Sequence, residues 1–371
     1  MIWSPQQSSA LLAAGSWLAD CRSEMRSGRT LSRPVFRLFG YAGTGKTTLA
    51  VHLASGVSFP VFAAFTGKAA LMMQRNRCTN ACTIHSLIYR PEVDEFDEVR
   101  FVLNEDSDAS TSDLIVIDEC SMVGPDLGAD LMSYGRPILV LGDPAQLPPV
   151  KGAGFFTDHP PDILLTEIHR QAAESPIIML ATDVRLGKRL SLGEYGSSRV
   201  IPRGSLTAKD VSAFDQVLVG RNRTRRTYNR RLRLELGFSS PFPEVNDRLV
   251  CLKNDKNLGI FNGGIFTVLK SDLAGNSVSM TVSSDDFEGR SPIPVNVRRE
   301  FFNGDPADIP KHALRVTQQF DFGYALTVHK SQGSQWHNVI IYDESEISGD
   351  DWHRWLYTAI TRAAESVTVV I

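Results

Sequence analysis

One glycine-rich turn constrains the fold of this 371-residue chain more than any other segment. Residues 40–47 read Gly-Tyr-Ala-Gly-Thr-Gly-Lys-Thr, which fits the pattern G-x-x-x-x-G-K-[ST]. The apolar run 35–39 comes before the turn, and a helical pattern starts at Lys46. In a strand–turn–helix unit of this kind, backbone N–H groups and the helix N-terminus face phosphate oxygens. The sequence therefore predicts a phosphate-binding loop in an α/β domain.

The residue types in this turn suit contacts with a triphosphate and a metal ion. Glycine keeps the backbone N–H groups accessible, the Lys46 side chain can reach the β- and γ-phosphates, and the Thr47 hydroxyl can hold Mg²⁺. A glycine-rich turn without a ligand is the alternative, which the correct strand and helix context disfavours. The expected nucleotide contacts in the turn are Gly43, Thr44, Gly45, Lys46, Thr47 and Thr48.

A pair of acids follows another predicted strand, 114–117, about 70 residues after the turn. Asp118 stands where a second Mg²⁺ contact is needed, and Glu119 can polarise the attacking water. A nucleotide kinase would share the phosphate loop but would not require this pair. Solvated acids at a strand end are the alternative explanation. The spacing from the loop favours nucleotide hydrolysis.

Apolar runs alternate with helical patterns along most of the chain, which predicts parallel sheets with crossover helices. Residues 5–20 predict a helix capped by Ser4, with Pro5 and Gln7 in its first turn. The apolar residues expected near one face of this helix are Leu11, Leu12, Trp17 and Leu18. The expected strands are 35–39, 61–65, 114–117, 137–141, 216–219, 324–328, 339–342 and 367–371.

Two stretches depart from this alternation. Residues 88–112 have two short strand-like pieces around an acidic turn, which predicts an inserted β-hairpin. Residues 241–317 contain short β-like runs separated by Pro, Gly and Asn, which indicates a small all-β module.

Composition excludes several classes of protein. Lys plus Arg is 39 and Asp plus Glu is 42, so the net charge of −3 excludes a generally basic coat but allows a local basic groove. The five cysteines form no paired C-x-x-C framework, which indicates a reducing, cytoplasmic setting. Cys78, Cys82 and His85 lack a matching pair of zinc ligands. No run reaches the roughly 18 apolar residues of a membrane helix, and we interpret the first residues as a helix, not a signal peptide.

Further motifs, taken in order, resemble those of superfamily 1B helicases of the RecD and Dda type. Asp-Glu-Cys-Ser-Met at 118–122 and Gly-Asp-Pro-Ala-Gln-Leu-Pro-Pro at 142–149 resemble motifs II and III. Residues 165–171, 325–333 and 357–363 resemble motifs IV, V and VI. Each motif alone is weak, but their joint order across residues 3–370 is specific.

The resemblance implies two RecA-like parallel-sheet domains with two small insertions. Residues 1–87 and 113–165 would form domain 1A, which carries the phosphate loop, and 88–112 a pin-like hairpin, domain 1B. Residues 166–245 and 318–371 would form domain 2A, and 246–317 an SH3-like β insertion, domain 2B.

Further roles at the nucleotide are implied by the resemblance. Gln146 would sense the γ-phosphate, and Arg170 and Arg362 of the second α/β domain would stabilise charge on the transferring phosphoryl group. Gln7 resembles the adenine-reading glutamine of the family, and its neighbour Gln6 is the alternative. The implied cofactors are ATP and Mg²⁺.

The resemblance also implies a track for nucleic acid. Small donors and cations at strand ends suit phosphate and sugar oxygens and carry little base specificity. The expected contacts are Thr66, Lys68, Thr83, His85, Thr327, His329 and Lys330. Seven arginines in residues 221–233 form either a solvated helix face or a phosphate-tracking patch. Tyr89, Phe96 or Phe101 of the hairpin could stack on the last base pair or pack inside the hairpin, and the β module could grip the pin or the strand.

These expectations together predict an ATP-driven helicase or translocase on single-stranded DNA, which by resemblance moves 5′ to 3′. The expected partners are single-stranded DNA, DNA forks and proteins of replication or recombination. We expect a monomeric motor that does not contact membranes. A DNA-stimulated ATPase switch or loading factor without unwinding activity is the main alternative, and a P-loop phosphotransferase is a remoter one. The choice between DNA and RNA stays open.

Overall fold

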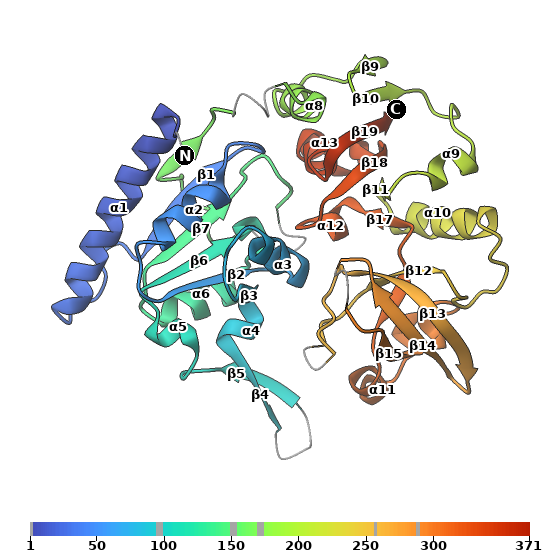
Figure 1. The fold of residues 1–371 in the computed structure, drawn as a ribbon, viewed down its shortest axis with the longest axis horizontal. Coiled ribbons are helices and arrows are strands. Elements are labelled where there is room, and N and C mark those ends of the chain that lie inside the picture. The colour runs from blue at the N-terminus through green and yellow to red at the C-terminus, as the bar shows by residue number, and fades with distance from the viewer. Residues whose placement is uncertain (1–2, 94–98, 149–153, 169–173, 256–257, 287–289) are drawn as a thin grey trace. The chain divides into compact units, whose positions relative to one another are not determined.

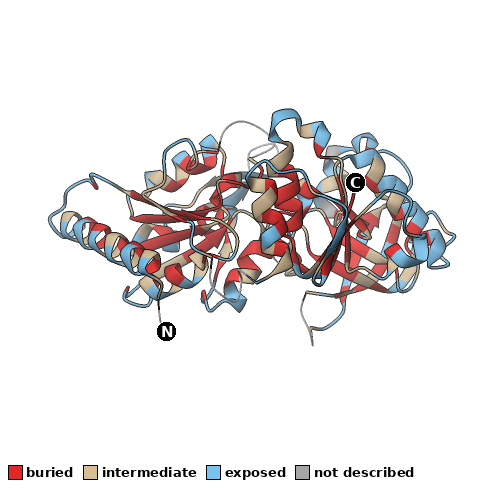
Figure 2. Cartoon of the chain, turned by 90° about the horizontal axis from the view of Figure 1, so that it is seen from above, coloured by how far each residue is buried: buried red, intermediate tan, exposed pale blue. Residues whose placement is uncertain are grey.

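The computed structural model describes residues 3–93, 99–148, 154–168, 174–255, 258–286 and 290–371 (Figure 1). The chain divides into two compact units, Met1–Ile178 (unit 1) and Met179–Ile371 (unit 2). Each unit contains a six-stranded, mainly parallel sheet with helices, which confirms the α/β fold class. Buried residues follow the strands of both sheets, and outer helix faces are exposed (Figure 2).

Unit 1 is built on a parallel sheet of strand order β3-β2-β6-β7-β1-β8. Its strands are β1 (Val35–Gly40), β2 (Pro60–Ala64), β3 (Cys82–Thr83), β6 (Leu114–Asp118), β7 (Ile138–Gly142) and β8 (Ile163–Leu165). Its helical segments include α1 (Pro5–Arg26), α2 (Lys46–Ala54), α3 (Gly67–Arg75), α4 (Ile84–Ile88), α5 (Asp108–Thr111), the 3₁₀ turn η1 (Cys120–Met122) and α6 (Pro125–Ser133). Successive residues of β6 enter two apolar clusters on opposite faces, so the sheet is covered on both sides.

Helix α1 begins as its sequence predicts. The Ser4 side chain accepts from the Gln7 N–H, and the Gln7 side chain accepts from the Ser4 N–H, which completes a capping box behind Pro5. The helix runs six residues past its predicted end and buries Ala10, Ala14, Trp17, Leu18 and Cys21. The placement of Leu12 on the apolar face was wrong, because that side chain is 76% exposed.

The stretch 88–112 contains a two-stranded antiparallel hairpin of β4 (Tyr89–Val93) and β5 (Val99–Leu103). Opposite charges face each other across the strands at Glu92 and Arg100. The hairpin lies between α4 and α5 in the chain and projects from the sheet of unit 1 (Figure 1). Its role as a strand-separating pin stays a prediction.

Unit 2 is built on a sheet of strand order β17-β11-β18-β19-β10-β9, in which β9 alone of the described strands pairs antiparallel. Its strands are β9 (Gly193–Tyr195), β10 (Ser198–Ile201), β11 (Gln216–Val219), β17 (Ala325–Thr327), β18 (Trp336–Tyr342) and β19 (Ala363–Val370). Its helical segments include α8 (Pro176–Arg185), α9 (Ala208–Ser212), α10 (Asn222–Glu235), α12 (Val328–Ser331), η4 (Ser345–Asp351) and α13 (Trp352–Ile360).

A five-stranded antiparallel sheet of strand order β15-β14-β13-β12-β16 is inserted in unit 2. Its strands are β12 (Arg248–Cys251), β13 (Ile265–Ala274), β14 (Ser277–Ser284), β15 (Ile293–Arg298) and β16 (Phe320–Phe322). Between β15 and β16 lie η2 (Arg299–Phe301), η3 (Pro306–Asp308) and α11 (Lys311–Val316). The sheet extends past the expected end at 317, because β16 pairs with β12 before the chain returns to β17.

The division between the units also falls later than the expected boundary at 165/166. It lies inside α8, between Ile178 and Met179. The backbone N–H groups of Thr166 and Glu167 donate to the Gln6 side chain of α1, which keeps this segment with unit 1.

All five cysteines are free thiols. Among the described residues, no helix combines the length and apolar character that a membrane crossing requires.

Candidate nucleotide site and nucleic-acid surfaces

The phosphate loop joins β1 to α2, and its geometry requires glycine at three positions. Gly43 and Gly45 have φ of 78° and 81°, in the left-handed region that side chains disfavour. A Cβ on Gly40 would lie 2.6 Å from Thr44 Oγ1 and 2.8 Å from Leu165 Cβ, closer than any stable contact. Glycine at these three positions therefore permits the tight conformation of the loop before α2.

The side chains of the loop are held by its own carbonyls. Lys46 Nζ donates to the carbonyl oxygens of Gly40 at 2.7 Å and Tyr41 at 3.1 Å. Thr44 is buried and its hydroxyl donates to the Tyr41 carbonyl at 2.8 Å, whereas Thr48 is exposed. The Lys46 ammonium thus lies across the loop, where phosphate oxygens are expected.

Thr47 and Asp118 meet, as the metal prediction requires. The Thr47 hydroxyl donates to Asp118 Oδ2 at 3.2 Å, which brings α2 and the end of β6 together. Burial raises the pKa of Asp118, against the lowering effects of the Glu119 N–H, the Lys46 ammonium and the Thr47 hydroxyl. A hydroxyl and a half-buried carboxylate are hard oxygen donors of the kind Mg²⁺ prefers, and a cation beside Asp118 would offset its desolvation. The donor set therefore fits Mg²⁺.

Glu119 has a backbone conformation that is rare for its residue type. Its φ of 51° and ψ of 45° are left-handed, which costs a non-glycine residue about 1–2 kcal/mol. The Glu119 N–H donates to Asp118 Oδ1 at 2.8 Å. Strain of this kind collects at functional sites. It turns the chain out of β6 immediately after Asp118, so the two adjacent acids have different surroundings.

Gln146 lies on the loop after β7, the strand beside β1 in the sheet. Asp143 Oδ1 accepts from the Ala145 N–H at 3.0 Å, and the Gln146 N–H donates to the Asp143 carbonyl at 3.2 Å. Gln146 is buried. The carboxyl ends of parallel strands meet at one sheet edge, where α/β proteins bind their ligands, so Gln146 shares that edge with the phosphate loop.

The two candidate adenine-reading glutamines have different partners. Gln7 is 2% exposed, and its Nε2 donates to the Thr44 carbonyl of the phosphate loop at 3.0 Å. Gln6 Oε1 instead accepts from the N–H groups of Thr166 at 2.8 Å and Glu167 at 2.9 Å. The structure brings Gln7, not Gln6, to the nucleotide loop.

Of the two candidate arginines, Arg170 lies outside the described residues. Arg362, in unit 2, is 5% exposed, and its guanidinium donates to the Thr358 carbonyl at 3.0 Å and to Thr361 Oγ1 at 3.2 Å. These bonds hold Arg362 against the end of α13.

Of the residues of unit 1 predicted to contact nucleic acid, two cap helices and a third is buried. Thr66 Oγ1 accepts from the Ala69 N–H at 3.1 Å and caps α3. Thr83 Oγ1 accepts from the Ser86 N–H at 3.1 Å and caps α4. Lys68 is only 5% exposed. Since β2 and β3 pair in parallel, the two threonines lie at one sheet edge.

His85 and His329 share an electrostatic property. His85 lies between aromatic rings, with centroid distances of 6.2 Å to Phe65 and 5.7 Å to Tyr89. Desolvation lowers the pKa of both histidines below the usual value of 6.5. Both rings are therefore mainly neutral at pH 7.

Thr327, His329 and Lys330 gather at the end of β17 in unit 2, where α12 begins. Thr327 is buried, whereas Lys330 is on the exposed side. Partial desolvation of its ammonium and the Arg225 and Arg226 cations lower the pKa of Lys330, while Asp321 opposes them. Neighbouring cations that lower a lysine pKa also create a potential that attracts anions.

Two arginines of α10 are buried in ion pairs with the inserted sheet. Arg225 Nη1 lies 2.6 Å from Asp321 Oδ2, and Arg233 Nη2 lies 2.7 Å from Asp247 Oδ2. The Arg233 guanidinium also lies 4.0 Å from the centroid of the Phe322 ring. These contacts attach α10 to the five-stranded sheet, so Arg225 and Arg233 belong to the core.

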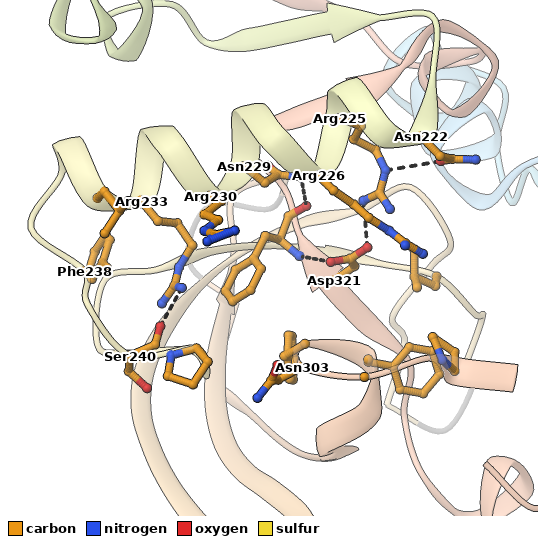
Figure 3. Close-up of a pocket in the computed structure, with 18 of the residues that line it drawn as sticks. Asn222, Arg225, Arg226, Asn229, Arg230, Arg233, Phe238, Ser240, Asn303 and Asp321 are labelled. Atoms are coloured by element: carbon orange, nitrogen blue, oxygen red, sulfur yellow. Dashed lines mark hydrogen bonds and ion pairs between the residues drawn. The ribbon is translucent and has the colours of Figure 1, made fainter. Parts of the chain in front are cut away.

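The neighbouring arginines Arg226 and Arg230 are exposed instead. They line a cavity of about 740 Å³ between α10 and the connection that follows β15, together with Lys330 and the aromatic rings of Phe301 and Phe302. Figure 3 shows α10 along one wall and Asn303 on the opposite wall. This set of residues, Arg226, Arg230, Lys330, Phe301 and Phe302, is named the α10 groove. It combines cations with aromatic faces, as strand-binding surfaces do.

Comparisons with known proteins agree with these motifs. A family model described as an AAA domain matches residues 25–204, and one described as a UvrD-like helicase C-terminal domain matches residues 322–370. The ATP-dependent RecD2 DNA helicase of Deinococcus radiodurans is 31% identical over 364 residues, which cover 88% of this chain and 46% of the relative. The ATP-dependent DNA helicase dda of Enterobacteria phage T4 is 34% identical over 167 residues, which cover 40% of this chain and 37% of the relative.

These matches and the order of the motifs make the chain similar to superfamily 1B helicases. It spans less than half the length of these two superfamily 1B relatives. A solved structure on DNA unwinding at forked dsDNA by two coordinating Pif1 helicases is 20% identical, with a TM-score of 0.62, and covers 99% of this chain and 92% of that one. This likeness shows the shared fold and fits two RecA-like domains.

The three aromatic residues predicted for the hairpin are not equivalent. Phe96 lies outside the described residues. The Tyr89 hydroxyl donates to Asp130 Oδ2 of α6, so Tyr89 is committed to the hairpin base. Phe101 is 71% exposed and stays a candidate for base stacking.

Sequence reasoning missed the α10 groove as a site. The arginine-rich pattern indicated either phosphate contacts or a solvated helix face. It did not distinguish the buried arginines of this helix from the exposed ones. The one sequence signal for Phe301 and Phe302 was that two adjacent aromatic residues follow the charged residues Arg298, Arg299 and Glu300.

Proposed function

We propose that this chain is an ATP-driven motor that moves on single-stranded DNA and separates duplex strands. The observation that carries the proposal is the 3.2 Å contact between Thr47 and Asp118, next to Lys46 and Glu119. Because of this contact, the four residues proposed to bind and hydrolyse the nucleotide lie together in unit 1. The match to helicase relatives supports the choice of a nucleic-acid motor over a phosphotransferase.

Hydrolysis in this proposal depends on positioning and electrostatics. Lys46 and the loop N–H groups bind the phosphates, and Thr47 and Asp118 would hold Mg²⁺. Bound Mg²⁺ would neutralise charge on the β- and γ-phosphate oxygens. Glu119 accepts the proton of the attacking water. Gln146, Arg170 and Arg362 remain predicted contacts of the γ-phosphate, and Gln7 that of the adenine.

The nucleic-acid contacts in this proposal are mainly to the backbone of the strand. Lys330, Arg226 and Arg230 bind phosphates, and the phenyl rings of the α10 groove offer stacking faces that tolerate any base. The relatives are named as DNA helicases, which favours DNA over RNA. The 5′ to 3′ direction follows from the family resemblance and awaits a direct test.

The proposed partners are single-stranded DNA and DNA forks, with the chain acting as a monomeric motor beside replication or recombination proteins. The hairpin would meet the duplex, with Phe101 as its exposed aromatic. A cytoplasmic setting follows from the bacterial and phage relatives.

The test measures ATP hydrolysis with and without single-stranded DNA, then unwinding of 5′-tailed and 3′-tailed duplexes of DNA and RNA. We expect strong stimulation by single-stranded DNA and unwinding of the 5′-tailed DNA duplex. Absence of stimulation by either nucleic acid refutes the motor. Stimulation without unwinding of any tailed duplex refutes strand separation and supports an ATPase switch.

A further inference from the structure

The base of the β4–β5 hairpin packs against the rest of unit 1, where Tyr89 and Leu103 are half-buried. Tyr89 and Leu103 pair across the strands and pack against an apolar cluster of the sheet. Farther out, Glu92 and Arg100 are exposed, and Phe101 is 71% exposed. A lone two-stranded hairpin is marginally stable in water. Its direction therefore depends on the contacts at its base.

Tyr134, the residue after α6, contacts both ends of the hairpin. Its hydroxyl oxygen lies 2.7 Å from the Asn104 carbonyl oxygen and 3.1 Å from the Ile88 carbonyl oxygen, and it can donate to either. The Asn104 N–H also donates to the Ile88 carbonyl at 2.8 Å. One phenol thus joins the residue before β4 to the residue after β5.

A second phenol joins the hairpin to the same helix. The Tyr89 hydroxyl, on β4, donates to Asp130 Oδ2, on α6. Burial raises the pKa of Tyr89, and the hydrogen bond to the Asp130 carboxylate raises it further. The phenol therefore stays protonated at neutral pH and keeps donating. Tyr89, Asp130 and Tyr134 are named the hairpin clamp.

Helix α6 packs against the sheet that carries the phosphate loop. It follows η1, which starts directly after Glu119. Its buried residues Leu127 and Leu131 pack in the same apolar cluster as Ile115 and Ile117 of β6. A hairpin clamped to α6 is therefore fixed to the body that carries Asp118 and Glu119.

We propose that the hairpin clamp sets the direction of the β4–β5 hairpin, so that its exposed face meets a duplex in one orientation. The clamp residues are positioning residues, since none is among the nucleotide contacts assigned above. The proposal rests on the proposed function, because it concerns strand separation by a DNA motor. It requires that loosening the clamp uncouples strand separation from ATP hydrolysis.

The double variant Tyr89→Phe with Tyr134→Phe tests the clamp. It keeps both rings in the apolar cluster and removes only the hydroxyls. The matched control is Tyr195→Phe, which removes a 2.8 Å bond from a phenol to the Ser191 carbonyl in unit 2. We expect DNA-stimulated hydrolysis within about twofold of the wild type and at least tenfold slower unwinding of a tailed duplex. Unchanged unwinding overturns the proposal, as does an equal loss of hydrolysis and unwinding.

Hydrogen exchange gives a readout that does not depend on helicase activity. In the double variant, the amides of residues 89, 90, 92 and 100–103 should exchange at least tenfold faster, while those of β6 and β7 keep their protection. Unchanged exchange in the hairpin overturns the clamp. A wild-type chain that unwinds no tailed duplex refutes the proposed function, and exchange then still decides whether the phenols hold the hairpin.

Discussion

The phosphate loop of unit 1 and helix α10 of unit 2 are both proposed to bind phosphate, and they differ in how each residue acquires its role. In the loop, consecutive residues owe their roles to their immediate neighbours, as with Gly45, Lys46 and Thr47. In α10, arginines close in sequence have different roles because different residues pack against them. Arg225 is buried beside Asp321, whereas Arg226 is exposed in the α10 groove. In a loop whose backbone binds the ligand, the sequence spacing decides the role of each residue. On a helix face, the tertiary contacts of each side chain decide it.

The largest effect on ATP hydrolysis is expected from a substitution in the phosphate loop. Lys46→Ala should lower ATP hydrolysis by about 10³-fold or more, because it removes a preorganised cation from the phosphate oxygens. A phosphate-release assay with saturating single-stranded DNA measures this. The control is Lys188→Ala, a lysine paired with Asp183 in unit 2. If hydrolysis by Lys46→Ala stays within tenfold of the wild type, Lys46 does not have the phosphate-binding role that the loop motif predicts.

The second prediction concerns Glu119, the second of the two adjacent acids after β6 in unit 1. Glu119→Gln should lower hydrolysis by about 10²- to 10⁴-fold, since a carboxamide cannot accept the proton of water. Binding of a fluorescent ATP analogue should stay within about threefold of the wild type, because Thr47 and Asp118 keep their contact. If this variant loses ATP binding, Glu119 is not the base.

Arg225→Ala tests the buried side of α10. Breaking a buried ion pair leaves Asp321 uncompensated, which should lower the free energy of unfolding by about 3–5 kcal/mol. Thermal and urea unfolding measure the change. Arg223→Ala, at an exposed position of the same helix, is the control and should change stability by less than about 0.5 kcal/mol. Equal losses in both variants would contradict the division of roles in α10.

The exposed side of α10 is tested by Arg226→Ala with Arg230→Ala. We expect weaker binding of single-stranded DNA at every sequence and a salt slope reduced by about 1.4, from about 0.7 for each lost phosphate contact. Fluorescence anisotropy from low to moderate salt measures both quantities. The melting temperature should match that of the wild type. An unchanged salt slope would show that these two arginines do not bind DNA phosphates and form a solvated helix face instead.

The smallest expected effect concerns pH. Burial holds the pKa of His85 and His329 below 6.5 in the free chain, and a bound phosphate would raise it. Binding then takes up protons, so DNA affinity should rise about two- to threefold as pH falls from 7.5 to 5.5. His85→Gln with His329→Gln should flatten this dependence. His337→Gln, at an exposed histidine beside Glu365, should leave it intact.

Much of the fold was predictable because its strands are short, apolar and separated by helical patterns. The predicted strand 216–219 coincides with β11, and the predicted strand 114–117 lies within β6. The edge strand β15 escaped prediction, since Pro294 lies inside it and proline is tolerated only at sheet edges or bulges. The pairing of β16 with β12, five residues past the expected module end, is a long-range contact that local pattern cannot report.

The sequence by itself determined the nucleotide site, because the contacts of a phosphate loop come from consecutive backbone groups and from acids at a strand end. Motif and spacing predicted that Thr47 and Asp118 share one metal site, and their side chains meet. The tertiary structure alone decided which arginines of α10 are buried, which glutamine reaches the phosphate loop, and that Tyr89 holds the hairpin base. Those choices depend on partners far along the chain, and only packing brings such partners together.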